Sequence, residues 1–204
     1  CAGTMPLNVV DLGAGDGAKT EILLHAATTS AMDVTYVPID ISSHAVDGVT
    51  RQMARKFPEM PIAGLVAEYM GALHWLNQPV ERRRNLVLFL GSNIGNFNKA
   101  QARRFLRQLW SALAPDDLLL VGFDLKKDIE LLLAAYNDAN GVTAEFNLNL
   151  LARVNSELDA DFDLSAFRHY STYDVFTGAM ESYLVSMQRQ VVSVGALNTD
   201  FEFD

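Results

Sequence analysis

The chain has 204 residues, of which 50% are hydrophobic and 20% are charged, so it is long and apolar enough to bury a core and lacks the composition of a disordered segment. Its 16 lysine and arginine residues stand against 25 aspartate and glutamate residues, and the net charge of −9 disfavours nucleic acid as a partner. We interpret the only basic run, Arg82 to Arg84, as a solvated loop.

Short apolar runs alternate with amphipathic segments along the chain, the pattern of consecutive β-α units around a parallel sheet. Strands are predicted at 7–12, 34–39, 62–67, 85–90 and 118–125. Helices are predicted at 18–29, from Ser42 or Ser43 to 57, from 100 to Pro115, at 128–139 and at 143–158.

Two of these helices carry apolar side chains at helical spacing. Phe105, Leu109 and Trp110 belong to one stripe of the helix that begins near residue 100. Phe146 and Leu150 open a series at spacings of four in the helix at 143–158. Such stripes are typical of helices that pack one face against a core.

The character of the chain changes after Phe167. Residues 167–173 and 180–194 alternate between apolar and polar, with Thr177-Gly178 between them, and this predicts an antiparallel hairpin. No linker and no repeat interrupts the sequence. We therefore predict that 1–204 form a single α/β domain of the Rossmann-like class, a mostly parallel sheet with helices on both faces and a C-terminal antiparallel hairpin.

Cysteine and histidine are too sparse to indicate a disulfide or a metal site. Cys1 is the only cysteine, and the four histidines form no pair at metal-ligand spacing.

No apolar run approaches the ~20 residues of a membrane span, and no signal peptide precedes the first strand. We expect a cytoplasmic protein without a membrane partner. The sequence opens on Cys1 and stops at Asp204 without a tail, so we expect both ends to be cut. The sequence contains no uninterrupted apolar surface helix, so it does not indicate an oligomeric state.

In an open parallel sheet, the ligand binds at the carboxyl ends of the strands. The first predicted strand runs into the stretch Asp11-Leu12-Gly13-Ala14-Gly15-Asp16-Gly17, which opens a helix. Glycines permit a tight turn and close approach of a ligand, and the helix start offers free N–H groups. This loop fits methyltransferases that use S-adenosylmethionine (SAM). It also fits the dinucleotide form G-x-G-x-x-A, with Ala18 in the last place.

Acidic residues follow the next two strands. Asp40 can accept both hydroxyls of a ribose, which serves SAM and NAD alike, or it can help to cap the following helix. Glu68 can accept the exocyclic amine of adenine while Tyr69 packs on the ring, although Tyr69 taken alone is equally compatible with a core position. Because NAD-binding folds do not usually depend on such a pair, it favours SAM.

Amide and hydroxyl side chains follow the fourth and fifth strands. Asn96 can donate to a carboxylate and accept from an amine without adding charge; alternatively, Asn96 or Asn98 caps the next helix. Tyr136 stands between alanines and the polar pair Asn137-Asp138, and so it resembles a core residue less than its leucine neighbours do. These residues are candidates for holding a small polar substrate.

Taken together, these segments resemble the histidine Nα-methyltransferases of ergothioneine biosynthesis and their relatives. The similar stretches are 11–20, 36–42, 89–97, 124–128, 135–147 and 167–169. The most specific is Ala135-Tyr136-Asn137-Asp138-Ala139-Asn140-Gly141-Val142-Thr143-Ala144-Glu145-Phe146-Asn147. The resemblance runs over nearly the whole chain.

The resemblance implies SAM as the cofactor. The cofactor-binding residues that it implies are Gly13, Gly15, Lys19, Asp40, Glu68, Tyr69 and Gly91. Gly13 and Lys19 would hold the methionine part, Asp40 the ribose, and Glu68 with Tyr69 the adenine. Gly91 would lie beside the reacting amine. The family usually has Asp-Phe where this chain has Glu68-Tyr69, which is a conservative departure.

The resemblance also implies an amino acid as the methyl acceptor, first of all L-histidine, whose product would be Nα-trimethylhistidine. Asn96 and Tyr136 would bind the carboxylate and α-amine. Ser182 stands where the family tends to carry a methionine in the substrate pocket, which puts the pocket's identity in question. The family's N-terminal helical segment and its imidazole-recognising C-terminal segment are expected outside 1–204.

The implied reaction is an in-line displacement in which an unprotonated amine attacks the sulfonium methyl. An α-amino group titrates near ~8, so the neutral Asn96 amide and Tyr136 hydroxyl suffice, and we predict no general base. Three alternatives stay open: a methyltransferase for a different amine, a SAM-binding module without catalysis, and a nicotinamide-dependent oxidoreductase. A nicotinamide-dependent oxidoreductase would not need the pair Glu68-Tyr69.

Overall fold

A computed structural model describes residues 6–76 and 83–204, and the chain divides into two compact units, Cys1–Asp124 and Leu125–Asp204. That these residues form a single methyltransferase domain stays a prediction. None of the helices in the described ranges is long and apolar enough to cross a membrane.

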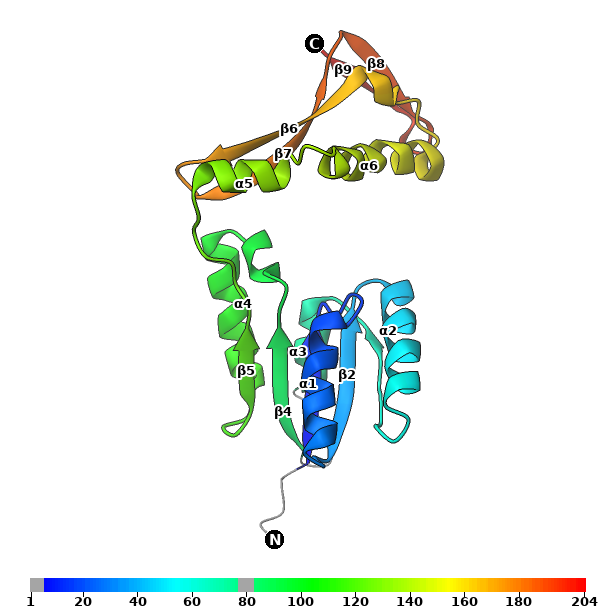
Figure 1. Cartoon of the computed structure of the whole chain (residues 1–204). Helices are drawn as coiled ribbons and strands as arrows, with labels where there is room; N and C mark the ends of the chain where they lie inside the picture. The colour runs from blue at the N-terminus through cyan, green and yellow to red at the C-terminus, as the bar shows by residue number, and fades with distance from the viewer. Residues whose placement is uncertain (1–5, 77–82) are drawn as a thin grey trace. The chain divides into compact units, whose positions relative to one another are not determined.

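The first unit is a parallel sheet of five strands in the order β3-β2-β1-β4-β5 (Figure 1). The strands are β1 (Leu7–Leu12), β2 (Val34–Asp40), β3 (Leu65–Val66), β4 (Arg84–Phe89) and β5 (Leu118–Val121). The helical segments are α1 (Ala18–Thr29), α2 (Ser43–Lys56), α3 (Tyr69–Leu76), η1 (Asn93–Asn96) and α4 (Lys99–Ala112). The predicted α/β fold with a parallel sheet is confirmed.

Both faces of the sheet are buried, because successive side chains of a strand point to opposite faces. Val9 and Leu88 pack with apolar residues of α1 and α2. Val10 and Phe89 pack with apolar residues of α3 and α4. The central strand β1 pairs with β2 on one side and with β4 on the other, so the strand order reverses there. This reversal places a ligand crevice at the carboxyl ends of β1 and β4.

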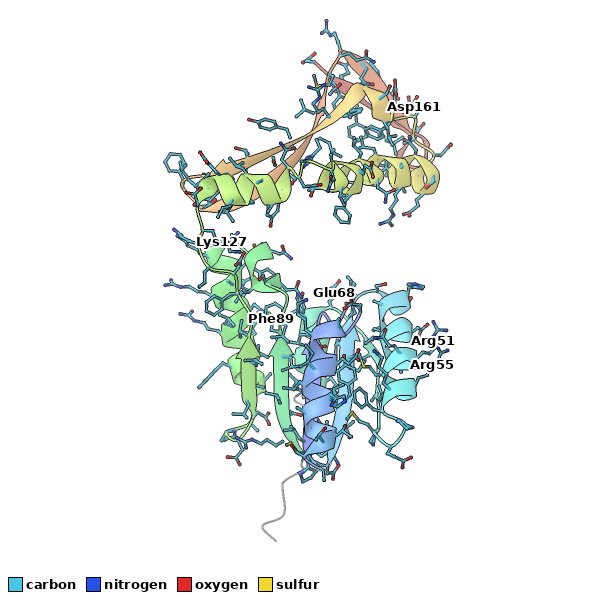
Figure 2. All side chains as sticks on the ribbon, viewed as in Figure 1. Arg51, Arg55, Glu68, Phe89, Lys127 and Asp161 are labelled. Atoms are coloured by element: carbon cyan, nitrogen blue, oxygen red, sulfur yellow. The ribbon has the colours of Figure 1, made fainter. Side chains whose placement is uncertain are left out.

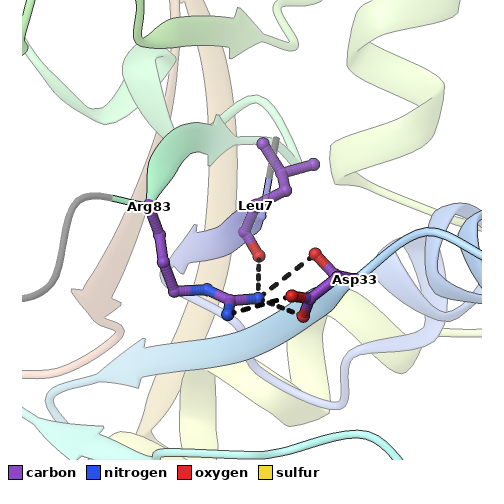
Figure 3. A network of polar contacts seen from close by, with 3 residues as sticks. All are labelled: Leu7, Asp33 and Arg83. Atoms are coloured by element: carbon purple, nitrogen blue, oxygen red, sulfur yellow. Dashed lines mark hydrogen bonds and ion pairs between the residues drawn. The ribbon is translucent and has the colours of Figure 1, made fainter. Parts of the chain in front are cut away.

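The amino end of the sheet is held by Arg83. Its Nη2 donates to Oδ1 of Asp33 at 2.6 Å and to the carbonyl oxygen of Leu7 at 3.4 Å (Figure 3). The Arg83 side chain is only 23% exposed and Arg84 begins strand β4, so the interpretation of this run as a solvated loop is wrong for both residues. Arg82 lies outside the described residues. The contact joins the starts of three neighbouring strands.

Several expectations for the first unit are corrected, among them the strand predicted at 118–125, which ends at Val121. β3 is shorter than predicted: the chain pairs with β2 at Leu65 and Val66 and in an isolated bridge at Ile62, and between them Gly64 lies against α2. Helix α3 was not predicted, since its apolar residues show no clear stripe. Trp110 is 79% exposed, because it lies at the edge of a stripe whose centre is Phe105 and Leu109.

The second unit contains two helices and two separate hairpins. Its elements are α5 (Ile129–Tyr136), α6 (Val142–Leu158), η2 (Leu164–Ala166), β6 (Phe167–Asp174), β7 (Ala179–Ser186), β8 (Gln190–Val194), η3 (Gly195–Leu197) and β9 (Thr199–Phe203). The predicted hairpin is confirmed as β6–β7, and β8–β9 is a second one that was not predicted. The predicted strand at 180–194 is broken between Ser186 and Gln190, and at this break Ser186 Oγ donates to the carbonyl of Gln188.

The core of this unit is aromatic. Phe167 is 5% exposed and meets Phe203 edge to face, with ring centroids 5.2 Å apart. The buried residue of α6 is Leu151, whereas Phe146 and Leu150 are 77% and 57% exposed. The series at spacings of four therefore does not mark the core-facing side, because it drifts around a helix of 3.6 residues per turn.

Asp138 fixes the start of α6. Its carboxylate accepts from the backbone N–H of Val142 at 3.0 Å and of Thr143 at 2.8 Å, and these bonds lower the pKa of Asp138 to about 2. A lowered folded-state pKa gives stability that is present above the ordinary value of 3.8 and is lost as the pH falls through about 2. We expect Asp138→Asn to unfold at a lower temperature than the native chain at pH 7.

This difference in melting temperature should shrink between pH 4 and pH 2, as the native carboxylate is protonated. Circular dichroism melts over that pH range measure it. Asp128→Asn is the control for a generic capping effect, because Asp128 accepts a single backbone N–H, from Glu130. A difference that stays constant with pH would rule out the assigned role of the Asp138 charge.

Candidate functional site

The loop between β1 and α1 has a backbone that requires glycine. Gly13, Gly15 and Gly17 have φ of +76°, +54° and +70°, a region that is strained for residues with a Cβ. The N–H groups of Gly13 and Ala14 both donate to the carbonyl of Ile39, at 2.8 and 3.1 Å. The loop is therefore held against the end of β2, and it lies at the crevice predicted from the strand order.

A buried carboxylate anchors the root of this loop. Asp11 is 3% exposed, and its Oδ2 accepts from Thr20 Oγ1 at 2.5 Å and from the Tyr36 hydroxyl at 3.1 Å. Burial raises the pKa of Asp11, and the two hydrogen bonds act against that rise. The pKa of Tyr36 is also raised, by burial and by Asp11. Sequence reasoning did not single out Asp11; a carboxylate inside an apolar strand was the signal.

Asp40 joins the glycine loop to the end of β2. Its Oδ2 accepts from the N–H of Gly15 at 3.1 Å and its Oδ1 from the N–H of Ser42 at 3.0 Å. The N-cap of α2 is Ser42, whose Oγ accepts from Ala45. A carboxylate has about four acceptor positions, so Asp40 can still accept from a ligand.

A cavity of about 630 Å³ opens beside Asp40. Its lining residues are Gly13, Gly15, Ile39, Asp40, Ile41, Ala67, Glu68, Tyr69, Met70, Asn93, Phe97, Gln101, Arg104, Phe105 and Gln108. Figure 2 shows Glu68 at the carboxyl end of the sheet. The cavity thus combines two carboxylates with apolar and aromatic walls, as small-molecule sites commonly do.

Tyr69 satisfies both interpretations that the sequence left open. It lines the cavity, and its ring also meets Phe89 and Phe97 edge to face, with centroids 5.3 and 5.9 Å apart. Burial, followed by the charge of Asp40, raises the pKa of Tyr69. The Tyr69 hydroxyl therefore stays protonated and can act as a hydrogen-bond donor in the cavity.

A second, smaller cavity of about 170 Å³ lies along the glycine loop. It is lined by Asp11, Gly13 to Thr20, Leu90, Gly91 and Asn93. Lys19 reaches from α1 toward the loop after β4, since a Cβ on Gly91 would lie 3.7 Å from Lys19 Nζ. A cation beside the free N–H groups of a helix start suits a carboxylate.

Asn93 lies at the junction of the two cavities. It lines both, and its Nδ2 would be 2.8 Å from a Cβ on Gly13. The sequence pointed instead to Asn96, which is exposed at the end of η1 and lines neither cavity. The helix cap is Asn98, which forms a capping box with Gln101 at the start of α4.

The other predicted substrate residues belong to the second unit. Tyr136 ends α5 and is 43% exposed, which agrees with its interpretation as a residue outside the core. Ser182 is exposed on β7, opposite Ser171. Within the described ranges, no group of three or more His, Cys, Asp or Glu side chains is placed to hold a metal ion.

The structure thus brings the predicted cofactor residues of the first unit around two cavities that share Gly13, Gly15 and Asn93. One cavity offers carboxylates and aromatic walls, and the other offers a cation with backbone N–H groups. A nucleoside joined to an amino acid has the matching parts: a diol, a base with an exocyclic amine, and a carboxylate. The donor and acceptor set therefore fits such a cofactor.

Comparison with known proteins gives one family, described as "Histidine-specific methyltransferase, SAM-dependent", which matches residues 2–204. A histidine N-alpha-methyltransferase of Mycobacterium tuberculosis is 36% identical over 96% of this chain and 60% of its own length. Ergothioneine biosynthesis protein 1 of Schizosaccharomyces pombe is 29% identical over 97% of this chain and 26% of its own. A 4-dimethylallyltryptophan N-methyltransferase of Aspergillus fumigatus is 28% identical over 94% of this chain and 59% of its own.

Proposed function

Because the chain belongs to the family of SAM-dependent, histidine-specific methyltransferases, we propose that the protein transfers methyl groups from SAM to the α-amine of L-histidine, to give Nα-trimethylhistidine. The family match confirms the predicted family and cofactor. The chain spans about 60% of the length of the mycobacterial relative, and the activity is proposed for the whole protein. The observation that carries the proposal is the pair of adjoining cavities around Asp40 and Lys19.

The cofactor would lie across these two cavities. Asp40 would accept from the ribose hydroxyls and Glu68 from the amine of the base, while Lys19 would pair with the carboxylate of the methionine part. The glycine loop leaves room for this approach, because a Cβ at Gly13 would press on Asn93. Bound SAM supplies an activated methyl group, so the protein needs chiefly to position the reactants and exclude water.

Asn96 and Tyr136 are proposed to bind the amino-acid substrate, with Ser182 in its pocket. An attacking amine needs a free lone pair, so the α-ammonium group of the substrate must lose its proton before it reacts. Neutral amide and hydroxyl groups do not stabilise the ammonium form as a carboxylate would. The proposal therefore includes no general base, and the pH dependence of turnover should follow the substrate amine.

Tyr136→Phe and Asn96→Ala test the substrate assignment. Each change removes a hydrogen bond to the amino-acid end of the substrate, and a hydrogen bond to a charged group such as its carboxylate is worth about 1.5–3 kcal/mol. We expect kcat/KM for L-histidine to fall at least about tenfold in each variant, while the affinity for S-adenosylhomocysteine (SAH) stays unchanged. Mass spectrometry of methylated histidine, with calorimetry for SAH, provides both measurements on the purified protein.

Tyr170→Phe is the matched control, since Tyr170 is 60% exposed on β6 and has no proposed role. Unchanged turnover and histidine affinity in both Tyr136→Phe and Asn96→Ala would contradict their assignment. Binding of SAH without methylation of any amine would instead indicate a SAM-binding module without catalysis.

A second candidate function is methylation of a different amine. A relative of similar coverage is named for 4-dimethylallyltryptophan, and Ser182 departs from the methionine that the resemblance led us to expect. Incubation with a panel of L-amino acids and their derivatives separates the two candidates. Faster methylation of histidine than of tryptophan derivatives supports histidine as the substrate, and the reverse order supports a different amine.

A further inference from the structure

Helix α4 presents a polar stripe to the larger cavity. Gln101, Arg104 and Gln108 line it at positions i, i+3 and i+7, which fall on one face of a helix. The apolar residues Phe105 and Leu109 form the adjoining stripe, and both are buried in the core. Gln101 and Arg104 are exposed and Gln108 is half-buried, and all three side chains form part of the wall of the cavity that Glu68 also lines.

Two of these side chains have unused donors. Within 6–76 and 83–204, the side chains of Arg104 and Gln108 make no hydrogen bond or ion pair, whereas the Gln101 side chain accepts from the N–H of Asn98 in the capping box. Residues 99–112 contain four basic residues and no acidic one, so no carboxylate of α4 neutralises Arg104. The wall thus offers one charged and one neutral donor group to the cavity.

The donors of α4 complement the acceptors of a purine base. Adenine carries one exocyclic amine, for which Glu68 is the proposed acceptor, and its other polar atoms are the ring nitrogens N1, N3 and N7, all of them acceptors. A planar guanidinium can donate to such an atom or lie against a ring, and Tyr69 and Phe105 give the same cavity an aromatic wall. The Glu68 carboxylate and the donor groups of Arg104 and Gln108 together would select adenine over a base with a different arrangement of hydrogen-bond donors and acceptors.

We propose that Arg104 and Gln108 recognise the adenine base of the cofactor by donating hydrogen bonds to its ring nitrogens. The proposal rests on the proposed SAM function and adds the residues that select the base. Arg103 and Arg107, on the same helix, do not line this cavity; they line other surface hollows, one of which Arg104 and Gln108 also line. Arg103 is therefore a matched control, with the same side chain one residue away.

The test is calorimetric titration of the purified protein with SAH and with its 1-deaza, 3-deaza and 7-deaza analogues, each of which replaces one ring nitrogen by C–H. We expect the native protein to bind at least one analogue about tenfold more weakly than SAH, as for one lost hydrogen bond to a charged group. Arg104→Met should bind SAH about tenfold more weakly and bind that analogue no more weakly than SAH. Gln108→Leu should lose less than tenfold in affinity for SAH, and Arg103→Met should keep the native affinity.

Three outcomes would overturn the proposal. One is equal binding of SAH by Arg104→Met and Arg103→Met. Another is a loss in Arg104→Met that is the same for SAH and for every analogue, because Arg104 would then act away from the ring nitrogens. The third is a native protein that binds SAH and all analogues equally. A native protein that does not bind SAH would instead refute the SAM function itself. Thermal melts of the variants, all changed at polar positions of α4, check that folding is preserved.

Discussion

Asp40→Ala is expected to weaken the binding of SAH by about a hundredfold or more. A carboxylate that accepts from both ribose hydroxyls makes two hydrogen bonds of about 1.5–3 kcal/mol each, and each 1.4 kcal/mol is a factor of ten in affinity. The same change removes the acceptor for the N–H of Gly15 and so loosens the loop that lines both cavities. Calorimetry with SAH measures the loss.

Asp40→Asn refines this test, because the amide keeps one oxygen acceptor and replaces the other by a donor; its affinity should lie between those of the native protein and Asp40→Ala. Asp47→Ala is the control: Asp47 is exposed on α2 and lines neither cavity. If Asp40→Ala bound SAH as well as Asp47→Ala does, the ribose would have to be held elsewhere.

Gly17→Ala is expected to lower the free energy of unfolding by about 2–5 kcal/mol. A Cβ in the left-handed region costs roughly 1–2 kcal/mol, and Gly17 has a φ of +70°. The new methyl group would also lie 2.5 Å from Val49 Cγ2 and 2.8 Å from Met53 Cε. Both neighbours belong to the core between α2 and the sheet, and overpacking of a core costs about 1–3 kcal/mol.

Gly15→Ala isolates the backbone part of this cost, so the difference between the two variants gives the packing part. Gly15 also has a positive φ, +54°, but a Cβ there has no heavy atom within 4 Å. Its free energy of unfolding should therefore fall only by about 1–2 kcal/mol, the backbone cost alone. Urea titrations of both variants measure the difference. Equal losses would mean that the contact of Gly17 with α2 contributes nothing to stability.

The cofactor residues could be predicted because local sequence places them. A residue that directly follows a buried parallel strand lies at the carboxyl edge of the sheet, wherever the rest of the chain goes. Gly13, Asp40 and Glu68 were predicted on this ground, and all three line the larger cavity. Asn96 was chosen by the same rule, yet η1 turns the chain so that Asn93 takes the position beside the cavities.

Burial was predicted less well than element type. The helices of Trp110 and Phe146 were predicted, but both side chains are largely exposed. Periodicity gives the width of an apolar stripe, whereas its centre depends on where the neighbouring element packs. The second hairpin, β8–β9, was missed because the alternating pattern of β7 continues into β8 across a turn made by side-chain hydrogen bonds.

The sequence by itself determined the family, the cofactor, the parallel sheet and the residues at its carboxyl edge, because each depends on motifs or on patterns a few residues long. Only the tertiary structure decided that Asn93 lies against Gly13 and that Arg104 and Gln108 line the cavity of Glu68. These residues are separated by tens of positions along the chain. Their proximity comes from the packing of α4 and the loop after β4 onto the sheet, and helical periodicity alone does not orient that packing.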